Sequence, residues 1–249
     1  MTPDAIVVGS GPNGLAAAIT LARAGLKTVL REAQATIGGG LRSSELTLPG
    51  FTHDVCSAVH PLALSSPFFR TLPLADFGLE WVQPPAALAH PLDGGKAVML
   101  ERSVDATAAA LGGGGPDWRR LHAAFVEGWP GLSRDVLSPP VRLPRHPILM
   151  ARFGLQGLRS ATGLARGALH GTEARALFAG NAAHSFLPLD EPGTAAFGLL
   201  LSVAGHAVGW PIARGGSQRF ADALAGYFRS LGGEIQSDAP VERLDEVRS

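Results

Sequence analysis

The chain has 249 residues, of which 46% are hydrophobic and 17% charged, and its 21 acidic side chains balance 21 basic ones. This composition is typical of a packed globular protein and excludes the basic footprint of a nucleic-acid-binding domain. Cys56 is the only cysteine. The chain therefore cannot exchange a disulfide between two cysteines of its own, and we expect Cys56 to be a small buried residue.

The sequence opens with a dinucleotide-binding fingerprint. Its pattern predicts a strand over residues 5–8, a helix over 13–24 and a second strand over 28–30. Between the first strand and the helix, Gly9, Gly11 and Gly14 have the GxGxxG spacing. The first glycine allows a sharp turn, the second a close approach to a pyrophosphate, and the third tight packing of helix on strand. The free N–H groups at the helix start would then face the phosphates.

An acidic residue stands where a ribose-binding carboxylate is expected. Glu32 ends the second predicted strand, 18 residues after Gly14. A carboxylate accepts hydrogen bonds from ribose hydroxyls and repels a 2′-phosphate, which disfavours NADP. The loop and Glu32 together predict a site for the adenosine half of NAD or FAD.

A second glycine segment distinguishes FAD from NAD. Gly38–Arg42 follows Glu32 in an order that resembles the Glu-x5-Gly-Gly-x-x-Arg pattern of the FAD superfamily of amine oxidases and phytoene desaturases, with a third glycine as the one departure. In that family these glycines bring a second backbone segment to the FAD phosphates, which the arginine can neutralise. The resemblance implies FAD as cofactor, bound by Gly9, Ser10, Gly11, Pro12, Asn13, Gly14, Glu32, Gly39, Gly40, Leu41, Arg42 and Val241.

Later segments resemble the phytoene-dehydrogenase-like branch, which is related to the pyridine nucleotide-disulfide oxidoreductase domain-containing proteins. They lie at residues 46–54, 57–62, 205–211, 215–217, 221–224 and 232–235, in the family's order. The resemblance gives His60, Trp210, Gly215 and Gly216 as residues on the substrate side. His60, His184 and His206 are candidates to meet substrate or flavin, but no catalytic side chain is assigned and no metal cluster is predicted.

Hairpins and helices are expected between these segments. Leu46 and Leu48 before a Pro49-Gly50 turn predict one hairpin, and residues 86–90 with 97–100 predict another. Residues 103–186 are predicted to be mainly helical, with loops at residues 112–115 and at the prolines of 139–147. The uncharged run 192–213 is long enough to span a bilayer, but its glycines and His206 favour a buried helix.

The last predicted helix returns the chain to its first sheet. Ser217 is expected to cap a helix with Phe220, Leu224, Phe228 and Leu231 on one face, followed by a strand that leads to Val241. The predicted fold class is α/β. A Rossmann-like FAD-binding domain of the GR2 type, formed by residues 1–75 and 214–249, carries an inserted, mainly helical substrate domain of residues 76–213.

The resemblance also implies a missing part of the fold. Family members carry a Gly-rich segment near the C-terminus that contacts the flavin ring, and nothing after Val241 resembles it. We therefore expect the N-terminal half of a longer fold, inactive alone, with a downstream-encoded C-terminal half as partner. Because the first strand begins almost at Met1, no signal peptide is predicted and the expected location is cytoplasmic, with peripheral contact to a membrane that holds an apolar substrate.

Three functions fit this pattern. The favoured one is an FAD-dependent oxidoreductase that takes hydride from an apolar or amine substrate. A second is a non-catalytic binding protein on the same fold, like the Rab GDP-dissociation inhibitors, which the intact glycine set and Glu32 disfavour. A third is an NAD-dependent dehydrogenase, which the segment Gly38–Arg42 disfavours. The sequence does not distinguish carotenoid-like polyenes, amines and other apolar molecules as substrates.

Overall fold

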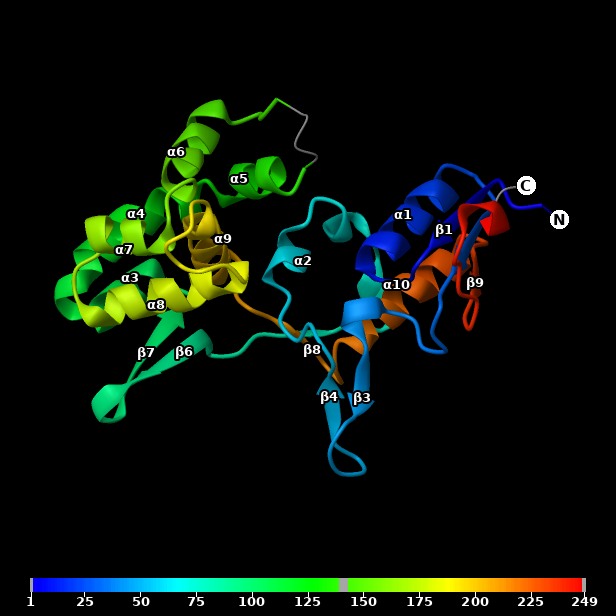
Figure 1. Cartoon of the computed structure of the whole chain (residues 1–249), viewed down its shortest axis with the longest axis horizontal. Coiled ribbons are helices and arrows are strands. Elements are labelled where there is room, and N and C mark those ends of the chain that lie inside the picture. Colours follow the sequence, from blue (N-terminus) through cyan, green and yellow to red (C-terminus); the bar gives the residue numbers. More distant parts are fainter. Residues whose placement is uncertain (1, 139–142, 248–249) are drawn as a thin grey trace. The chain divides into compact units, whose positions relative to one another are not determined.

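The structure is a computed structural model that describes residues 2–138 and 143–247. Two compact units make up the chain, and Figure 1 shows their helices and strands. The first unit, called here the nucleotide unit, comprises Met1–His60, Thr71–Val82 and Ile212–Ser249. The second, called here the helical unit, comprises Pro61–Arg70 and Gln83–Pro211.

These units differ from the predicted domains at two places. Residues 61–70 group with the helical unit, whereas residues 76–82 and 212–213 group with the nucleotide unit. The second difference has a direct cause, because β5 (Trp81–Val82) and β8 (Ile212–Ala213) pair as antiparallel strands. Because of this pairing, residues 81–82 and 212–213, where the chain passes from one unit to the other, belong to the nucleotide unit.

The nucleotide unit is built on a three-stranded parallel sheet in the order β1-β2-β9. Its strands are β1 (Ala5–Val8), β2 (Thr28–Arg31) and β9 (Glu234–Gln236), and its helices are α1 (Pro12–Arg23) and α10 (Gln218–Ser230). The connection from β1 through α1 to β2 and the connection from β2 through α10 to β9 progress in the same direction across the sheet. Because connections between parallel strands are right-handed, both helices lie on the same face of the sheet. The two helices do pack against each other, as Figure 1 shows. The predicted first strands, the crossover helix and the returning strand are confirmed.

The two faces of this sheet differ in burial. The register pairs Val7 with Leu30 and Ile6 with Val29. Leu30 is fully buried, as are Phe220, Leu224 and Phe228 of α10, so this face is the one that the helices cover. On the other face Val8 is 53% exposed. Among the described residues β1 also has no second neighbouring strand, so one edge and one partly apolar face of the sheet are open.

The hairpin after the second glycine segment lies slightly earlier than predicted. It consists of β3 (Ser43–Glu45) and β4 (Thr52–Asp54), which pair antiparallel. Leu46 and Leu48 lie in the exposed turn and not in a strand. Their alternation with polar residues therefore does not mark a buried sheet face. Cys56, which follows the hairpin, is exposed, so its predicted burial is wrong.

The helical unit surrounds one central buried helix. Its elements are α2 (Pro61–Ser65), β6 (Ala86–Leu92), β7 (Lys96–Glu101), α3 (Val104–Ala110), α4 (Gly115–Glu127), α5 (Trp129–Val136), α6 (Pro147–Gly157), α7 (Ala161–Ala168), α8 (Thr172–Ala182) and α9 (Thr194–Ala207). Helix α9 packs against α4, α6, α7 and α8 and is buried along most of its length. The predicted buried helix is confirmed, and no helix among the described residues is long and apolar enough to cross a membrane.

Glycines join α3 to α4 without the predicted loop. Gly112–Gly114 forms a 3₁₀ turn and Gly115 is the first residue of α4. A Cβ on Gly115 would lie 2.0 Å from the carbonyl oxygen of Ala108. The glycines therefore permit close packing of two helices. Of the proline cluster, Pro147 begins α6, whereas Pro139 and Pro140 lie outside the described residues.

Candidate dinucleotide-binding site

The fingerprint loop has the geometry that its glycines predict. Gly9 follows β1 with a φ of +93°, and its N–H donates to the carbonyl oxygen of Arg31 at 2.7 Å. A Cβ on Gly14 would lie 1.9 Å from the carbonyl oxygen of Gly9. Only glycine can therefore occupy position 14 with this approach of α1 to the end of β1.

The second glycine segment lies directly on the fingerprint loop. Gly39 has a φ of +55°, and a Cβ there would lie 3.0 Å from the Cα of Gly11. At Gly11 itself a Cβ would meet nothing within 4 Å, so the other side of the loop is open. Gly11 is also the N-cap of α1, with no side chain bonded to the helix start. Two glycine segments and a helix N-terminus thus form a cradle that fits a pyrophosphate.

Glu32 is held in place beside this cradle. Its Oε2 accepts the backbone N–H of Ser10 at 2.9 Å and the Ser10 hydroxyl, and its Oε1 accepts the backbone N–H of Gln34 at 3.0 Å. Burial opposes ionisation of this carboxyl, but the hydrogen bonds from Ser10 and Gln34 outweigh it, so the pKa of Glu32 is lowered. A carboxylate offers about four acceptor positions, which leaves one free for a ribose hydroxyl.

Ser10 connects the two glycine segments. Besides its bonds to Glu32, its Oγ accepts the N–H of Gly38 at 3.0 Å. Ser10 is fully buried. The sequence predicts Ser10 only as a member of the loop, and nothing in the GxGxxG pattern indicates that its hydroxyl would bridge residues 22 and 28 positions away.

Arg42 and Leu41 complete the second segment. Leu41 is buried, and the Arg42 Nε donates to the carbonyl oxygen of Gly39 at 3.1 Å. The positive charge of Arg42 also contributes to the lowered pKa of Glu32. Gly40 is exposed beside Cys56, whose Sγ would lie 3.7 Å from a Cβ on Gly40.

The chain before Val241 runs along the end of β2, but not as a strand. Strand β9 ends at Gln236, because Asp238 has a φ of +52° that breaks the extended conformation. The N–H of Ala239 then donates to the carbonyl oxygen of Glu32 at 2.9 Å, and Arg31 donates to the carbonyl oxygen of Pro240 at 3.2 Å. The return strand therefore ends before Val241, although the residues that lead to Val241 bond to the end of β2, and the contact of Val241 with adenine stays a prediction.

His60 is packed among the side chains of the nucleotide unit. Its ring contacts Trp81 and Phe220, and its Nε2 lies 2.9 Å from the Ser217 Oγ. The Ser217 hydroxyl donates to the carbonyl oxygen of Ser57 at 2.6 Å, so His60 must be the donor to Ser217. Burial lowers the pKa of His60. These contacts give His60 a structural role, and its predicted contact with substrate stays a prediction.

Ser217 begins α10 as predicted, but its side chain does not cap the helix. Instead the Asp54 Oδ1 accepts the Ser217 N–H at 2.7 Å, and the Ser43 Oγ accepts the Gln218 N–H at 3.0 Å. Gly216, with a φ of +98°, allows the start of α10 to approach Ser43, because a Cβ on Gly216 would lie 2.8 Å from the Ser43 Oγ. Gly216 thus lies against the β3–β4 hairpin, whereas Gly215 lies beside the Arg219 side chain, and the predicted place of both glycines on the substrate side stays a prediction.

The remaining predicted residues lie in the helical unit. Trp210 is buried, donates to the carbonyl oxygen of Leu201 at 3.3 Å and stacks edge-on against His184. His206 accepts the Trp118 Nε1–H at 3.0 Å, and His122, which the sequence analysis missed, stacks on Trp118 with ring centroids 4.0 Å apart. The i, i+4 spacing of Trp118 and His122 on α4 was the available signal.

Burial keeps these two histidines neutral. It lowers the pKa of His122 to about 3, helped by the neighbouring His206, and the pKa of His206 to about 4. The Nε2 of His122 has no hydrogen-bond partner among the described residues. Within the same residues no group of His, Cys, Asp and Glu side chains could hold a metal ion.

Comparison by sequence matches the chain in parts. A family model described as an NAD(P)-binding Rossmann-like domain covers residues 7–71. A limonene dehydrogenase chain of Castellaniella defragrans is 27% identical over 137 residues, which are 55% of this chain and 24% of that protein. Thiamine thiazole synthase of Saccharolobus islandicus is 53% identical over 38 residues, which are 15% of this chain and 14% of that protein.

Solved structures match nearly the whole chain. Putrescine oxidase bound to putrescine has a TM-score of 0.59 at 18% identity, and the match covers 97% of this chain and 52% of that one. An oxidoreductase from Methanosarcina mazei has a TM-score of 0.54 at 18% identity, covering 94% and 51%. The chain therefore shares the fold of these oxidoreductases and contains a Rossmann-like dinucleotide-binding domain, in agreement with the predicted α/β fold class. It spans about half the length of these structures and a quarter or less of the sequence relatives.

Proposed function

We propose that this chain is the nucleotide-binding part of an FAD-dependent oxidoreductase. The observation that carries the proposal is the contact of Gly39 with Gly11, because it joins a second glycine segment to the fingerprint loop. Gly11 and Gly39 would hold the pyrophosphate, Glu32 the ribose, and Val241 would lie near the adenine. When bound, FAD supplies an acceptor for hydride from substrate, while the protein binds, orients and excludes water.

Titration of the purified chain with FAD and with NAD tests this assignment. FAD is expected to bind and NAD to bind weakly or not at all. Gly39→Val, whose side chain would press on Gly11, should lower FAD affinity at least tenfold, on the order of 1.4 kcal/mol or more. Gly154→Ala is the matched control, because a Cβ there meets nothing within 4 Å. Binding of NAD but not FAD would instead favour a dehydrogenase, and binding of neither would favour a non-catalytic binder.

Two substrate classes remain for this oxidoreductase. The match to limonene dehydrogenase supports an apolar substrate, in line with the phytoene-dehydrogenase-like branch, and the fold shared with putrescine oxidase supports an amine. We propose the apolar class, because the match to limonene dehydrogenase is a sequence match that extends over 55% of this chain. In the enzyme completed by the C-terminal half proposed below, the expected result is anaerobic bleaching of bound flavin by a terpene or polyene, and not by a diamine.

We further propose that a C-terminal half, encoded downstream, completes the enzyme. The open edge of β1 and the exposed Val8 support this, because an unpaired strand edge and an apolar face favour a covering partner. Turnover is expected only when that half is added to the 249-residue chain. Reduction of flavin by substrate with the short chain alone would contradict this part of the proposal and leave the FAD site intact.

A further inference from the structure

One face of helix α6 exposes apolar side chains to solvent. Ile148, Leu155 and Leu158 are each between 73% and 75% exposed, and Leu143 just before the helix is 90% exposed. Ile148 and Leu155 are seven residues apart and so lie on the same helix face, with Leu158 continuing it past the last turn. The opposite face of α6, at Phe153 and Gly157, is buried against the unit.

Arginines accompany these apolar residues. Arg152 lies four residues after Ile148 and three before Leu155, so its side chain shares their face. Arg145, Arg152, Arg159 and Arg166 recur every seven residues, and the sequence has no acidic residue between Asp135 and Glu173. The face formed by Arg145, Ile148, Arg152, Leu155 and Leu158 is called here the α6 face.

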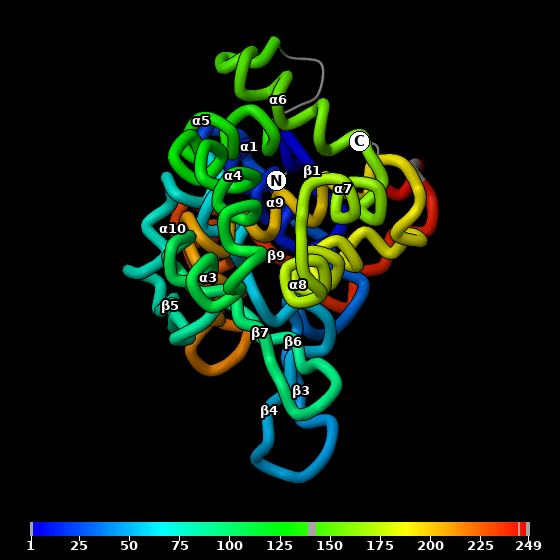
Figure 2. Tube along the Cα trace, turned by 90° about the vertical axis from the view of Figure 1, so that its left-hand side faces the viewer, coloured from blue at the N-terminus to red at the C-terminus, as the bar shows by residue number. Residues whose placement is uncertain are grey.

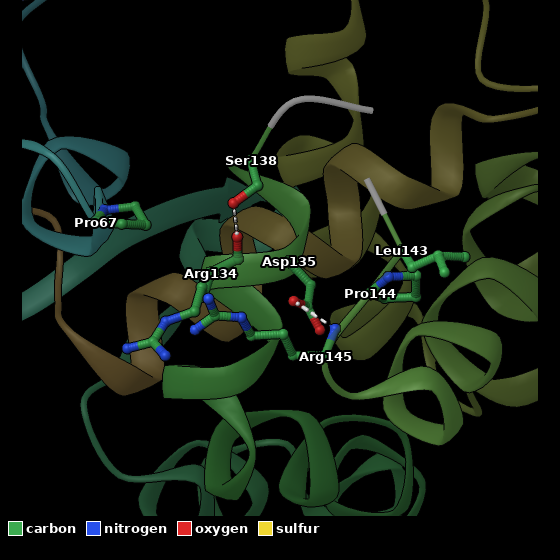
Figure 3. A pocket seen from close by; sticks show the side chains of 7 residues that line it. All are labelled: Pro67, Arg134, Asp135, Ser138, Leu143, Pro144 and Arg145. Carbon is green, nitrogen blue, oxygen red and sulfur yellow. Dashed lines mark hydrogen bonds between the residues drawn. The ribbon is translucent and has the colours of Figure 1, made fainter. Parts of the chain in front are cut away.

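One carboxylate, that of Asp135, lies at the start of this face. Asp135 accepts the backbone N–H groups of Arg145 and His146 at 3.1 and 2.8 Å, and its side chain is only 5% exposed. Figure 3 shows this arrangement, in which the side chains of Arg134 and Arg145 extend past Asp135 into one pocket of about 170 Å³. Two guanidinium groups and the Asp135 carboxylate, which backbone N–H groups engage, therefore line this pocket, and the excess of positive charge at the start of α6 favours an anionic group.

A second hollow lies beside the middle of the helix. It measures about 330 Å³ and is lined by Arg120 and Arg152 together with the apolar Leu121, Ala124 and Phe125. Its lining combines a cationic part with an apolar wall. This combination matches the anionic headgroup and the acyl chain of a lipid more closely than it matches a free anion, which needs no apolar wall.

We propose that the α6 face attaches the helical unit to the surface of a membrane that contains anionic lipids. The exposed aliphatic side chains would enter the interface, and the arginines would keep their guanidinium groups at the headgroups. The helix has 11 residues, about 16 Å, so it would lie along the surface. The proposal does not depend on the bound cofactor.

Co-sedimentation with vesicles tests this attachment. The 249-residue chain is expected to bind vesicles of phosphatidylcholine with phosphatidylglycerol more tightly than vesicles of phosphatidylcholine alone, and less tightly at high salt. The double substitution Arg145→Gln, Arg152→Gln should weaken binding to the anionic vesicles about 25-fold, about fivefold for each arginine. The triple substitution Ile148→Gln, Leu155→Gln, Leu158→Gln should weaken binding to both kinds of vesicle by about 100-fold.

A matched control lies on the β6–β7 hairpin, at the end of the helical unit away from α6 in both views (Figures 1 and 2). Lys96 and Met99 are exposed there, so Lys96→Gln with Met99→Gln removes one charge and one apolar side chain elsewhere. This variant should bind vesicles like the wild type. Thermal melting of all variants checks that they fold, which is expected because every substituted side chain is at the surface.

Three results would overturn the proposal. The first is equal binding of the wild type to both kinds of vesicle. The second is wild-type binding by the triple variant. The third is a wild-type chain that self-associates or binds an acidic polypeptide through the α6 face but does not bind vesicles, which would assign the face to a protein partner.

Discussion

The backbone N–H of Ser10 donates to the Glu32 carboxylate at 2.9 Å, and the hydroxyl of the same serine donates to the same oxygen. One side chain in the fingerprint loop thus fixes the acidic residue at the end of β2. Because the Ser10 Oγ also accepts the N–H of Gly38, it orients both glycine segments toward a common ligand. The proposed cofactor site is held in position by protein groups before any ligand binds, which reduces the entropy cost of binding.

Replacement of Glu32 by alanine should weaken FAD binding. The change removes an acceptor for the ribose hydroxyls, and each hydrogen bond to a charged group contributes on the order of 1.5–3 kcal/mol. Fluorescence titration with FAD measures the loss. Glu32→Gln should retain part of the affinity, since its amide oxygen still accepts one hydrogen bond. Unchanged affinity in Glu32→Ala would mean that the carboxylate does not meet the ribose.

Ser10→Ala should destabilise the fold more near neutral pH than in acid, where only the loss of the Gly38 N–H bond to the Ser10 Oγ remains. The hydrogen bonds from Ser10 help to lower the pKa of Glu32 below its ordinary value of 4.5, and this contribution to stability is present only while the carboxyl is ionised. It is therefore present above about pH 4.5 and lost as the pH falls through the folded pKa. Between wild type and variant, the difference in the free energy of unfolding in urea should be larger at pH 7 than in acid by about 1 kcal/mol. A difference that does not change with pH would contradict this reasoning.

Asp54 should stabilise the start of α10. Its carboxylate accepts the Ser217 N–H at 2.7 Å and the Ser43 hydroxyl at 2.5 Å, and a negative charge at a helix N-terminus is favourable. Asp54→Ala is expected to lower the free energy of unfolding by about 1–2 kcal/mol. Asp76→Ala, at an exposed position of the same unit, should change it by less than about 0.5 kcal/mol. Equal effects of the two substitutions would deny Asp54 this role.

Local patterns predict the elements of the nucleotide unit well. The strand β1 has the predicted bounds, and α1 begins one residue before its predicted start, because Pro12 suits the first helical position. The glycine spacing also predicts the shape of the cradle, since close approach at Gly14 excludes every side chain. These features depend on residues that are neighbours in sequence or that satisfy a strict steric rule.

Features that depend on distant residues are not predictable in the same way. Ser217 has the residue type of a helix cap, yet its hydroxyl bonds to Ser57 and His60, and Asp54 from the hairpin takes the capping role. Leu46 alternates with polar residues and is still exposed. In both cases the local pattern fits two conformations equally well, and the tertiary contact that decides between them is absent from the sequence pattern.

The two buried histidines of the helical unit should make its stability depend on pH. Burial lowers the pKa of His122 to about 3 and of His206 to about 4, whereas both imidazoles have a pKa near 6.5 when the chain is unfolded. Between the folded and unfolded pKa values, the unfolded chain therefore binds more protons than the folded chain. The contribution of the two neutral histidines to the free energy of unfolding is full above about pH 6.5, and it falls as the pH drops toward 4 and then 3. The expected loss is on the order of a few kcal/mol.

Substitution of His122 by phenylalanine isolates this effect. A phenyl ring can keep the stacking on Trp118 but cannot take up a proton, so the variant should lose less stability than the wild type between pH 6.5 and 4, whatever its stability at pH 7. Urea unfolding followed by tryptophan fluorescence at several pH values gives the slopes. His53→Phe, on the β3–β4 hairpin and outside this core, is the control and should keep the wild-type slope. An identical pH dependence in His122→Phe and wild type would show that protonation of His122 does not couple to unfolding of the helical unit.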